Sequence, residues 1–326
     1  MKRLRSMRLS VFSFAMTLVG VVGFAQAQTA FPTKPITVVI PYPAGGSPDI
    51  GMRFLQQKFS EAIGAPVVLL NKPGASGMVG MAFVANAEPD GYTLAATTSS
   101  SITVVQIGSA KVPYNTTDFV PLGNYAVDVS TLIVAKDSPF ANFDALVAAA
   151  KSRPGALNFG TPGAGTLSSL NLSSVKDGLG LDIMEVPFPG TPQVMTNILG
   201  KQIDGGAAAF SSFAGAVEDG RLRSLVVAGH KRLAKFPDIP TLAEKGLKDG
   251  GLNLNLGLFA PKGTPEAVVQ KLQQAIKKAA ADPTVVASIE KAGMVAEFEE
   301  PDDVVKSLER EHAGVVVLGQ KLKRVK

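Results

Sequence analysis

Short apolar runs alternate with amphipathic segments along most of the chain. Ile36–Ile40 is a continuous apolar, β-branched run, and after a Gly/Pro-rich loop residues 50–63 place apolar side chains at helical spacing. The same pattern predicts strands over residues 67–70 and 93–97 and a helix over residues 78–85. Such alternation is typical of right-handed parallel βαβ units, in which helices cover both faces of a sheet.

A second series of the same kind follows. It comprises a helix over 143–151 capped by Asn142, strands over 157–159, 183–186 and 203–207, and helices from about 166 and over 192–199. Apolar strands over 130–135 and 254–259 lie at the two joins, and further helices are expected over 265–281, 283–292 and 301–322. The sequence therefore predicts two α/β lobes with mainly parallel sheets: residues 28–130 and 255–326 form lobe 1, and residues 131–254 form lobe 2. We expect a ligand site in the cleft between them.

The first 27 residues have the pattern of a cleaved secretory signal peptide. Four basic residues precede an apolar run over 9–24, and Ala25, Gln26 and Ala27 form an A-x-A cleavage site. The apolar run is shorter than the ~20 residues that span a bilayer, which disfavours the alternative of a retained anchor. We expect cleavage after Ala27 and a periplasmic protein that begins at Gln28.

Charge and cysteine content narrow the function classes. Without the four basic residues of the leader, 28 Lys and Arg residues face 27 Asp and Glu residues, so the chain has no basic bias that would attract nucleic acid. The sequence contains no cysteine, which excludes disulfides, thiol catalysis, thiolate metal sites and a lipid-modified cysteine after the leader.

The loop after the first strand offers backbone donors to an anion. Ser47 is a suitable N-cap, Pro48 suits the first helical position, and Asp49 lies in the first turn. Gly45 and Gly46 allow close approach to the backbone. This start of a helix could bind an anion; the alternative is an ordinary strand-to-helix turn.

Two further loops carry hydroxyl groups and glycines. Residues 160–166 read Gly-Thr-Pro-Gly-Ala-Gly-Thr and are followed by Ser168, and residues 99–101 are three serines after the third strand. The first loop lacks the Gly-Lys-Ser/Thr of a nucleotide-binding loop. The alternative, which is the commoner one for a run of serines, is a polar helix start.

Residues typical of catalysis are scarce. The two histidines, His230 and His312, lie in charged surroundings without a partner in a motif. An exported hydrolase that used Ser47 or Ser168 as nucleophile would need a base, and the sequence supplies none. We therefore predict no catalytic residue, no metal site and no cofactor.

Several motifs in the right order resemble one family of transport receptors. They are the segments at 41–49 (PYPAGGSPD), 71–77 (NKPGASG), 89–94 (PDGYTL), 235–241 (KFPDIPT) and 260–265 (APKGTP). The chain resembles the solute receptors of tripartite tricarboxylate transporters, also called Bug proteins, over nearly all its length after the leader. The resemblance implies a two-lobed Venus-flytrap fold similar to type II periplasmic binding proteins, with a carboxylate held between the lobes for a membrane permease.

The sequence also departs from the family pattern. Ala208 stands at a position that is often Asp, Ser168 stands where many members have a residue such as His, and Phe188 replaces a Tyr. Each change removes polarity, so we hypothesise a less polar distal pocket with Phe188, Phe210 or Phe213 near the ligand. That pocket would favour an aromatic or longer aliphatic carboxylate; the alternative places these phenylalanines in the core.

The predicted ligand-binding residues combine these loops with the segment after the strand over 203–207. They are Ala44, Gly45, Gly46, Ser47, Asp49, Ser99, Ser100, Ser101, Gly160, Thr161, Ala164, Gly165, Thr166, Ser168, Phe188, Phe210 and Ser211. The expected partners are a small carboxylate, with an aromatic or aliphatic dicarboxylate as one option, and a permease of the tripartite tricarboxylate type. The protein is expected to be a monomer. A sensory receptor that passes its closed form to a signalling protein remains the alternative with the same ligand site.

Overall fold

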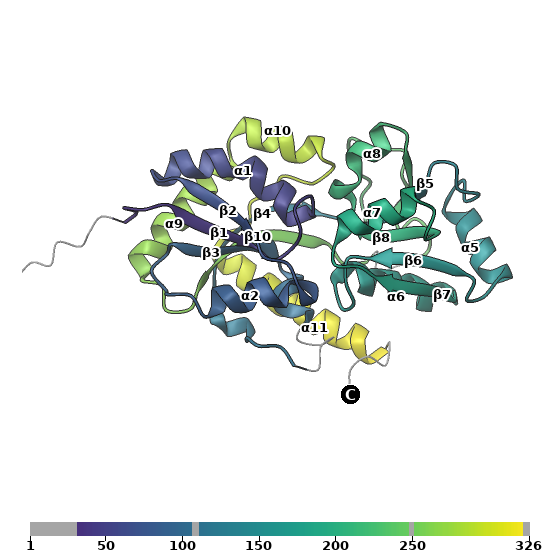
Figure 1. The fold of residues 1–326 in the computed structure, drawn as a ribbon, viewed down its shortest axis with the longest axis horizontal. Helices are drawn as coiled ribbons and strands as arrows, with labels where there is room; N and C mark the ends of the chain where they lie inside the picture. The colour runs from purple at the N-terminus through teal and green to yellow at the C-terminus, as the bar shows by residue number, and fades with distance from the viewer. Residues whose placement is uncertain (1–30, 106–110, 248–250, 322–326) are drawn as a thin grey trace, which may run out of the picture. The chain divides into compact units, whose positions relative to one another are not determined.

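The computed structural model describes residues 31–105, 111–247 and 251–321. The expected signal peptide and the basic end over 322–326 lie outside the described residues. The described residues from Pro32 onward belong to one compact unit, and within them lie two five-stranded sheets, each covered by helices (Figure 1). We call each sheet with its covering helices a lobe.

Lobe 1 is built on a sheet with the strand order β2-β1-β3-β10-β4. Its strands are β1 (Ile36–Ile40), β2 (Val67–Asn71), β3 (Thr93–Thr98), β4 (Phe119–Asp128) and β10 (Leu254–Pro261). β1 pairs in parallel with β2 and β3, whereas β10 runs antiparallel to β3 and β4. The parallel half is formed by consecutive strand-helix-strand segments. β10, from much later in the sequence, lies between β3 and β4.

Helices cover both faces of this sheet (Figure 1). α1 (Ser47–Ile63) packs against α9 (Glu266–Ala280) and α10 (Pro283–Lys291), and Met52, Leu55 and Phe59 form its buried stripe. On the other face, α2 (Met78–Ala85), α3 (Ser100–Thr103) and α11 (Pro301–Lys321) contribute to a cluster with Val39 and Phe259. Apolar residues that recur at helical spacing thus become the two faces of the lobe.

Lobe 2 has the strand order β7-β6-β8-β5-β9. Its strands are β5 (Ser130–Ala135), β6 (Leu157–Thr161), β7 (Ile183–Pro187), β8 (Gly205–Ala209) and β9 (Leu222–Val227). β6 is parallel to β7 and β8, and β5 is antiparallel to β8 and β9. One face packs on α5 (Phe143–Ser152) and α6 (Leu167–Leu179), and the other on α7 (Thr191–Leu199) and α8 (Ala214–Glu218).

The chain passes between the two lobes twice. β4 ends at Asp128 and β5 begins at Ser130, so the outward passage takes a single residue, Val129. β9 ends lobe 2 and β10 returns the chain to lobe 1, where α9, α10 and α11 follow. The end of β4 in lobe 1 therefore lies next to the start of β5 in lobe 2.

The predicted two-lobed α/β architecture is confirmed, and the sheets are mixed where mainly parallel sheets were expected. The strand β4 was not predicted; β4 and β9 pair antiparallel with β10 and β5. The strand expected over 203–207 begins at Gly205, because residues 200–204 form a turn after α7. No helix within the described ranges is long and apolar enough to cross a membrane.

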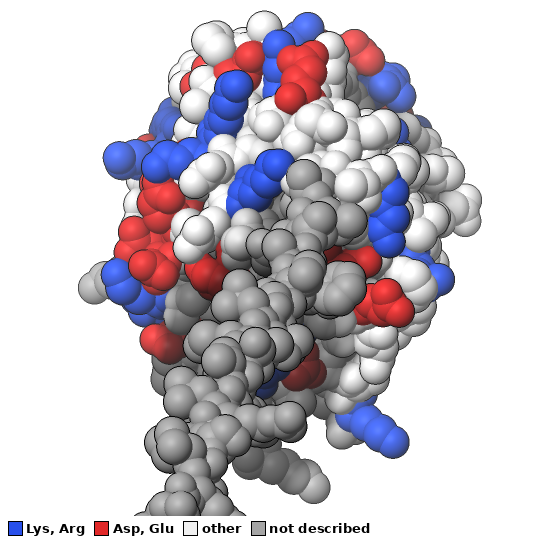
Figure 2. Space-filling model, turned by 90° about the vertical axis from the view of Figure 1, so that its left-hand side faces the viewer, with Lys and Arg blue, Asp and Glu red and all other residues white. Residues whose placement is uncertain are grey.

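The surface of lobe 1 mixes charges of both signs. In the face drawn in Figure 2, blue and red side chains lie among one another. Lys58 pairs with Glu61 and Asp282, and Lys277 pairs with Glu300. Neighbouring opposite charges cancel at a distance, so this face attracts neither polyanions nor polycations strongly.

Candidate functional site

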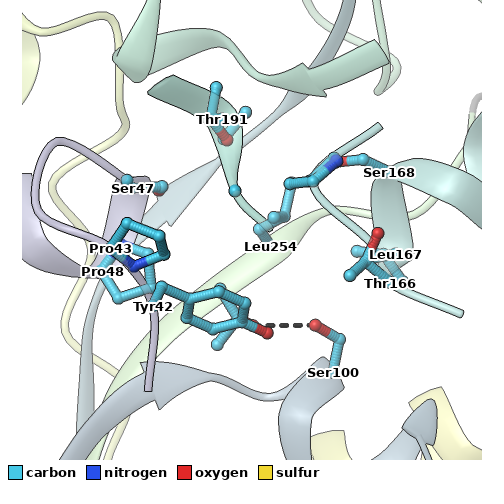
Figure 3. A pocket seen from close by; sticks show the side chains of 15 residues that line it. Tyr42, Pro43, Ser47, Pro48, Ser100, Thr166, Leu167, Ser168, Thr191 and Leu254 are labelled. Atoms are coloured by element: carbon cyan, nitrogen blue, oxygen red, sulfur yellow. Dashed lines mark hydrogen bonds between the residues drawn. The ribbon is translucent and has the colours of Figure 1, made fainter. Parts of the chain in front are cut away.

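A cavity lies between loops of lobe 1 and loops of lobe 2 (Figure 3). The empty space between its lining atoms is about 440 Å³, counting the open solvent at its mouth. Lobe 1 contributes Tyr42, Pro43, Gly46, Ser47, Pro48, Thr98, Ser100 and Leu254. Lobe 2 contributes Pro162, Thr166, Leu167, Ser168, Gly190, Thr191 and Ala209.

Three helices begin at this cavity. Ser47 is the first residue of α1, Leu167 the first of α6 and Thr191 the first of α7, and all three line the cavity. A helix N-terminus carries unpaired backbone N–H groups and about half a positive charge. None of the cavity-lining residues described here has a charged side chain. The cavity therefore offers neutral donors and helix ends to an anion.

The start of α1 differs from the predicted capping. Gly46 is the N-cap residue, Ser47 is already helical, and no side chain caps this end. Gly45 has φ +83°, a conformation that favours glycine, and its N–H donates to Asp49 Oδ2 over 2.9 Å. Ser47 was predicted as the N-cap, and this prediction is wrong because its hydroxyl group is engaged elsewhere.

The Ser47 hydroxyl donates to a buried carboxylate that the sequence analysis did not identify. Ser47 Oγ lies 2.5 Å from Oδ2 of Asp128, the last residue of β4. Ser211 Oγ, from lobe 2, lies at the same distance from the same oxygen. The backbone N–H groups of Val129 and Ser211 donate to Oδ1 over 2.8 and 3.4 Å. Asp128 thus binds the start of α1 to the segment after β8.

The ionisation of Asp128 is governed by opposing effects. Burial raises the pKa of its carboxyl group above the ordinary value, and the hydrogen bonds from Ser211, Ser47 and the backbone only partly oppose that rise. The sequence did contain an indication of this role. Asp128 lies within an apolar run, directly before the strand expected at 130, and a buried carboxyl group in such a place needs hydrogen-bond partners.

Asp49 has a different role from the one predicted. Its carboxylate accepts from Arg53 Nε at 2.9 Å and from Asn71 Nδ2 at 2.9 Å, in addition to the Gly45 N–H. Desolvation raises its pKa, but the hydrogen bonds from Arg53, Gly45 and Asn71 outweigh it and hold the pKa below the ordinary value. Asp49 does not line the cavity; it fixes the loop that does.

The serines after β3 divide between the cavity and the interior of lobe 1. Ser100 lines the cavity and shares a 2.8 Å hydrogen bond with Thr98. Ser101 bonds Tyr42 Oη over 2.8 Å, and burial raises the pKa of Tyr42, so this phenol stays neutral. Ser99 instead donates to Glu311 of α11 over 2.5 Å. The structure therefore brings only one of the three serines to the cavity.

The second predicted loop caps α6. Thr166 is the N-cap residue and accepts from the Ser169 N–H. Ser168 lines the cavity with its Oγ 3.2 Å from Ser130 Oγ. Gly160 and Thr161 belong to β6, and Thr161 donates to Glu185. The part of this loop that meets the cavity is thus its end, from residue 166 onward, together with Pro162.

The structure places five of the predicted ligand-binding residues in the cavity lining and the others elsewhere. Those in the lining are Gly46, Ser47, Ser100, Thr166 and Ser168. Those outside it are Ala44, Gly45, Asp49, Ser99, Ser101, Gly160, Thr161, Ala164, Gly165, Phe188, Phe210 and Ser211. Sequence reasoning missed Tyr42, Pro43, Pro48, Thr98, Pro162, Leu167, Gly190, Thr191, Ala209 and Leu254 as lining residues.

The phenylalanines lie in hydrophobic clusters of lobe 2. Phe210 is fully buried with Val129 and Val227, and its ring meets that of Phe236 edge to face with centroids 4.7 Å apart. Phe213 is fully buried in another cluster, against which Phe188 packs. The hypothesis that these rings face the ligand is therefore not supported by their positions. The apolar part of the lining comes from Leu167, Ala209 and Leu254 instead.

The two lobes touch around the cavity. Ser76 Oγ of lobe 1 donates to the Ala164 carbonyl of lobe 2 over 2.9 Å. Leu167, Leu170 and Ala209 of lobe 2 form one buried cluster with Val104, Leu254 and Val315 of lobe 1. Gly190 approaches Pro43 so closely that a Cβ atom would lie 2.7 Å from the proline ring. These contacts define a conformation in which the lobes are closed on the cavity.

Groups that could support metal or acid–base chemistry are few near this cavity. No group of three or more His, Asp or Glu side chains could hold a metal ion within residues 31–105, 111–247 and 251–321. His230 is exposed. His312 lies on α11, half-buried, and its Nδ1 lacks a hydrogen-bond partner. Neither histidine lines the cavity.

Comparison with known proteins identifies relatives over most of the chain. The family described as "Tripartite tricarboxylate transporter family receptor" matches residues 52–315. A UPF0065 protein of Cupriavidus necator is 38% identical over 279 residues, which cover 83% of this chain and 82% of the relative. Protein BugT of Bordetella pertussis is 28% identical over 296 residues, 90% of each chain.

Solved structures agree with this relationship. The periplasmic binding protein BugD is 28% identical, with a TM-score of 0.86 over 91% of this chain and all of that chain. MatC from Rhodopseudomonas palustris, solved with bound malate, is 26% identical, with a TM-score of 0.83 over 88% of this chain and 99% of that one. A further R. palustris protein, solved with adipate, is 25% identical, with a TM-score of 0.86 over 90% of this chain and 98% of that one.

The family match covers far more than half of the sequence, and the two-lobed fold agrees with it. This chain belongs to the tripartite tricarboxylate transporter receptor family of periplasmic solute-binding proteins.

Proposed function

We propose that this protein captures a small carboxylate in the cavity between its lobes and delivers it to a permease of the tripartite tricarboxylate type. The observation that carries the proposal is the convergence of the N-termini of α1, α6 and α7 on one cavity. An anion gains from the backbone N–H groups and the dipoles of such helix ends. Relatives of the same fold were solved with malate and adipate, which supports a carboxylate ligand.

The proposed mechanism is closure of the two lobes on the ligand. α1 belongs to lobe 1, and α6 and α7 belong to lobe 2, so a ligand that binds all three ends favours the closed conformation. Each charge-assisted hydrogen bond would contribute about 1.5–3 kcal/mol. The closed form would then be the species that the permease recognises.

The finer boundaries belong to this proposal as well. We propose that the leader is cleaved after Ala27 and that the lobe boundaries lie one residue from those expected, with Ser130 in lobe 2 and Leu254 in lobe 1. We further propose that Gly46, Ser47, Ser100, Thr166 and Ser168 contact the ligand and that the mature protein is a monomer. Mass spectrometry of protein secreted to the periplasm, with light scattering, tests the cleavage and the monomer.

We propose that the protein does no chemistry on its ligand. A serine hydrolase would need Ser47 as nucleophile and Asp128 as its base. The two oxygens of Asp128 already accept from four donors, and none of the residues that line the cavity is a histidine, a lysine or an acid that could serve as the base. Turnover of carboxylate esters by the pure protein would contradict this part of the proposal. A sensory role would appear as retained uptake and a lost transcriptional response in a deletion strain.

A thermal-shift screen tests the ligand class. The mature protein, unfolded and refolded to remove bound ligand, is screened against aliphatic and aromatic mono-, di- and tricarboxylates, with amines and neutral sugars as controls. A ligand at 100 times its Kd stabilises by about 2.7 kcal/mol, which raises Tm by a few degrees. Stabilisation by carboxylates alone supports the proposal, and stabilisation by controls alone contradicts it.

A further inference from the structure

The hydroxyl group of Ser47 stands between the cavity and a buried carboxylate. Ser47 lines the cavity, and its Oγ lies 2.5 Å from Asp128 Oδ2. Asp128 is 1% exposed and is not part of the lining. A ligand therefore meets the serine, and the hydrogen-bonding character of the serine is set by the carboxylate behind it.

Four donors surround the carboxyl group of Asp128. Oδ2 accepts from the hydroxyls of Ser47 and Ser211, and Oδ1 accepts from the backbone N–H groups of Val129 and Ser211. A carboxylate offers about four lone-pair positions and no proton of its own. The salt bridges formed by the described residues do not include Asp128. The partners of the Asp128 oxygens are thus four neutral donors.

This arrangement determines what Ser47 can offer to the cavity. A hydroxyl group has one hydrogen and two lone pairs. Because the hydrogen of Ser47 is directed at Asp128, only lone pairs remain for a ligand. A ligand group that donates a hydrogen bond is therefore accepted at this point. A carboxylate or ketone oxygen of a ligand would instead meet the lone pairs of Ser47 Oγ, with the Asp128 carboxyl oxygens behind them. The resulting repulsion would disfavour such ligands, and specific binding sites often use repulsion of this kind.

The other side of the cavity has the opposite preference. The first turns of α6 and α7 contain no acidic residue, whereas the first turn of α1 contains Asp49. The positive ends of α6 and α7 are thus uncompensated by local acids, while that of α1 has Asp49 and the Asp128 carboxylate beside it. A ligand carboxylate is best placed against lobe 2.

We infer that the cleft selects carboxylates that carry a hydrogen-bond donor, a hydroxyl or an ammonium group, on the side that faces Ser47. Asp128 is the positioning residue that sets this selectivity through Ser47. The inference rests on the proposed function, since it concerns the class of carboxylate that the same cavity binds.

Matched sets of acids test it. Each set shares one carbon skeleton and differs at carbon 2: propanoate, lactate, pyruvate and alanine; succinate, malate, oxaloacetate and aspartate; glutarate, 2-hydroxyglutarate, 2-oxoglutarate and glutamate. Calorimetric titration of the mature protein gives the Kd of each acid. We expect the hydroxy or amino acid of the set that fits the cavity to bind at least tenfold more tightly than its unsubstituted and oxo analogues.

Asp128→Asn provides the sharpest variant. The amide oxygen is needed by the two backbone N–H groups that Oδ1 now accepts, so the amide NH₂ group would face the two serine hydroxyls. Ser47 would then accept from the amide, and its own hydrogen would be free for the cavity. We expect the ratio of hydroxy-acid to oxo-acid affinity to fall at least tenfold. Urea denaturation verifies that each variant is folded.

Two serine variants complete the test. Ser47→Ala removes the acceptor, and the hydroxy and oxo acids should then bind within about threefold of each other. Ser211→Ala is the matched control, because Ser211 bonds the same oxygen of Asp128 but does not line the cavity; it should keep the wild-type ratio. A folded Ser47→Ala or Asp128→Asn protein with the wild-type ratio would overturn the inference. Binding of none of the twelve acids would overturn the inference together with its carboxylate premise, whereas binding without a donor preference would overturn the inference alone.

Discussion

A methyl group at Gly190 should oppose closure of the lobes without disturbing either one. Gly190 is the N-cap residue of α7 with φ 175°, an extended conformation that alanine adopts freely. A Cβ atom there would lie 2.7 Å from Cγ and 2.8 Å from Cδ of Pro43, across the cleft. The proline ring cannot swing away as a long side chain would. The clash is therefore confined to the conformation in which the lobes touch.

The magnitude follows from the cost of overpacking. An added methyl group in a tight contact costs about 1–3 kcal/mol, here only in the closed form. Ligand binding depends on that form, so Gly190→Ala should raise the Kd of the bound carboxylate about 5- to 150-fold. Isothermal titration calorimetry measures this change. The free energy of unfolding without ligand should change much less.

Two companion variants separate closure from a local effect on the cavity. Gly215→Ala adds a methyl group on α8 where no atom lies within 4 Å, and it should leave the Kd unchanged. Pro43→Ala removes Cγ and Cδ, so the further change Gly190→Ala should cost little in that background, and the double-mutant cycle isolates the contact. The reasoning is refuted if Gly190→Ala binds with wild-type affinity, or if its penalty is equally large without the proline ring.

Other parts of the structure lead to smaller, separable effects. Ser76→Ala removes the hydrogen bond to the Ala164 carbonyl and should raise the Kd about 2- to 10-fold in the same titration; an unchanged Kd would show that this contact does not assist closure. Asn142→Ala removes the cap of α5 and should lower the free energy of unfolding by about 0.5–2 kcal/mol in urea denaturation, with the Kd unchanged. Burial raises the pKa of Glu311 above the ordinary 4.5, against the hydrogen bonds from Ser99 and Thr103. The folded protein therefore keeps a proton that the unfolded chain loses from pH 4.5 upward, so the free energy of unfolding should fall as pH rises from about 4.5 through the raised pKa. Glu311→Gln should lack this fall in thermal denaturation across that range, and an identical pH profile for both proteins would contradict the assignment.

Local patterns were sufficient to predict most elements of the fold. The apolar run at Ile36–Ile40 and the helical spacing after it gave β1 and α1, and the Asn142 cap of α5 is present with its side chain accepting from Ala145. The strand β4 was missed because its sequence mixes glycine, proline and a charged residue with apolar ones. Its strand structure depends on pairing with β10, which is distant in sequence.

The candidate site was less predictable because its residues depend on how the lobes meet. Gly- and Ser-rich loops indicated Gly46, Ser47, Ser100, Thr166 and Ser168, which do line the cavity. Pro43, Thr191 and Leu254 carry no local mark of a ligand site, and only the closed arrangement brings them together. Asp128 was missed because its partners, Ser47 and Ser211, lie 81 and 83 residues away along the chain.

The phenylalanines show how burial overrides a pattern of substitution. Relative to the family pattern, this chain has less polar residues at Phe188 and in the segment around Phe210. That difference suggested that aromatic side chains contact the ligand. A fully buried phenyl ring gains more from close contact with other apolar groups than from an open cavity, and Phe210 finds that contact with Phe236. The selectivity of the cleft is therefore argued from Ser47 and Asp128 instead.

Closure on a carboxylate is the central claim, and a distance measured between the lobes tests it most directly. The chain has no cysteine, so Ala148→Cys on α5 and Ala267→Cys on α9, both exposed, place one spin label on each lobe. Pulsed electron paramagnetic resonance then gives the distance distribution without ligand and with the carboxylate that binds most tightly. The account predicts a broad distribution that shifts to a narrow, shorter one when the ligand saturates. A distribution that is unchanged at saturation would contradict it.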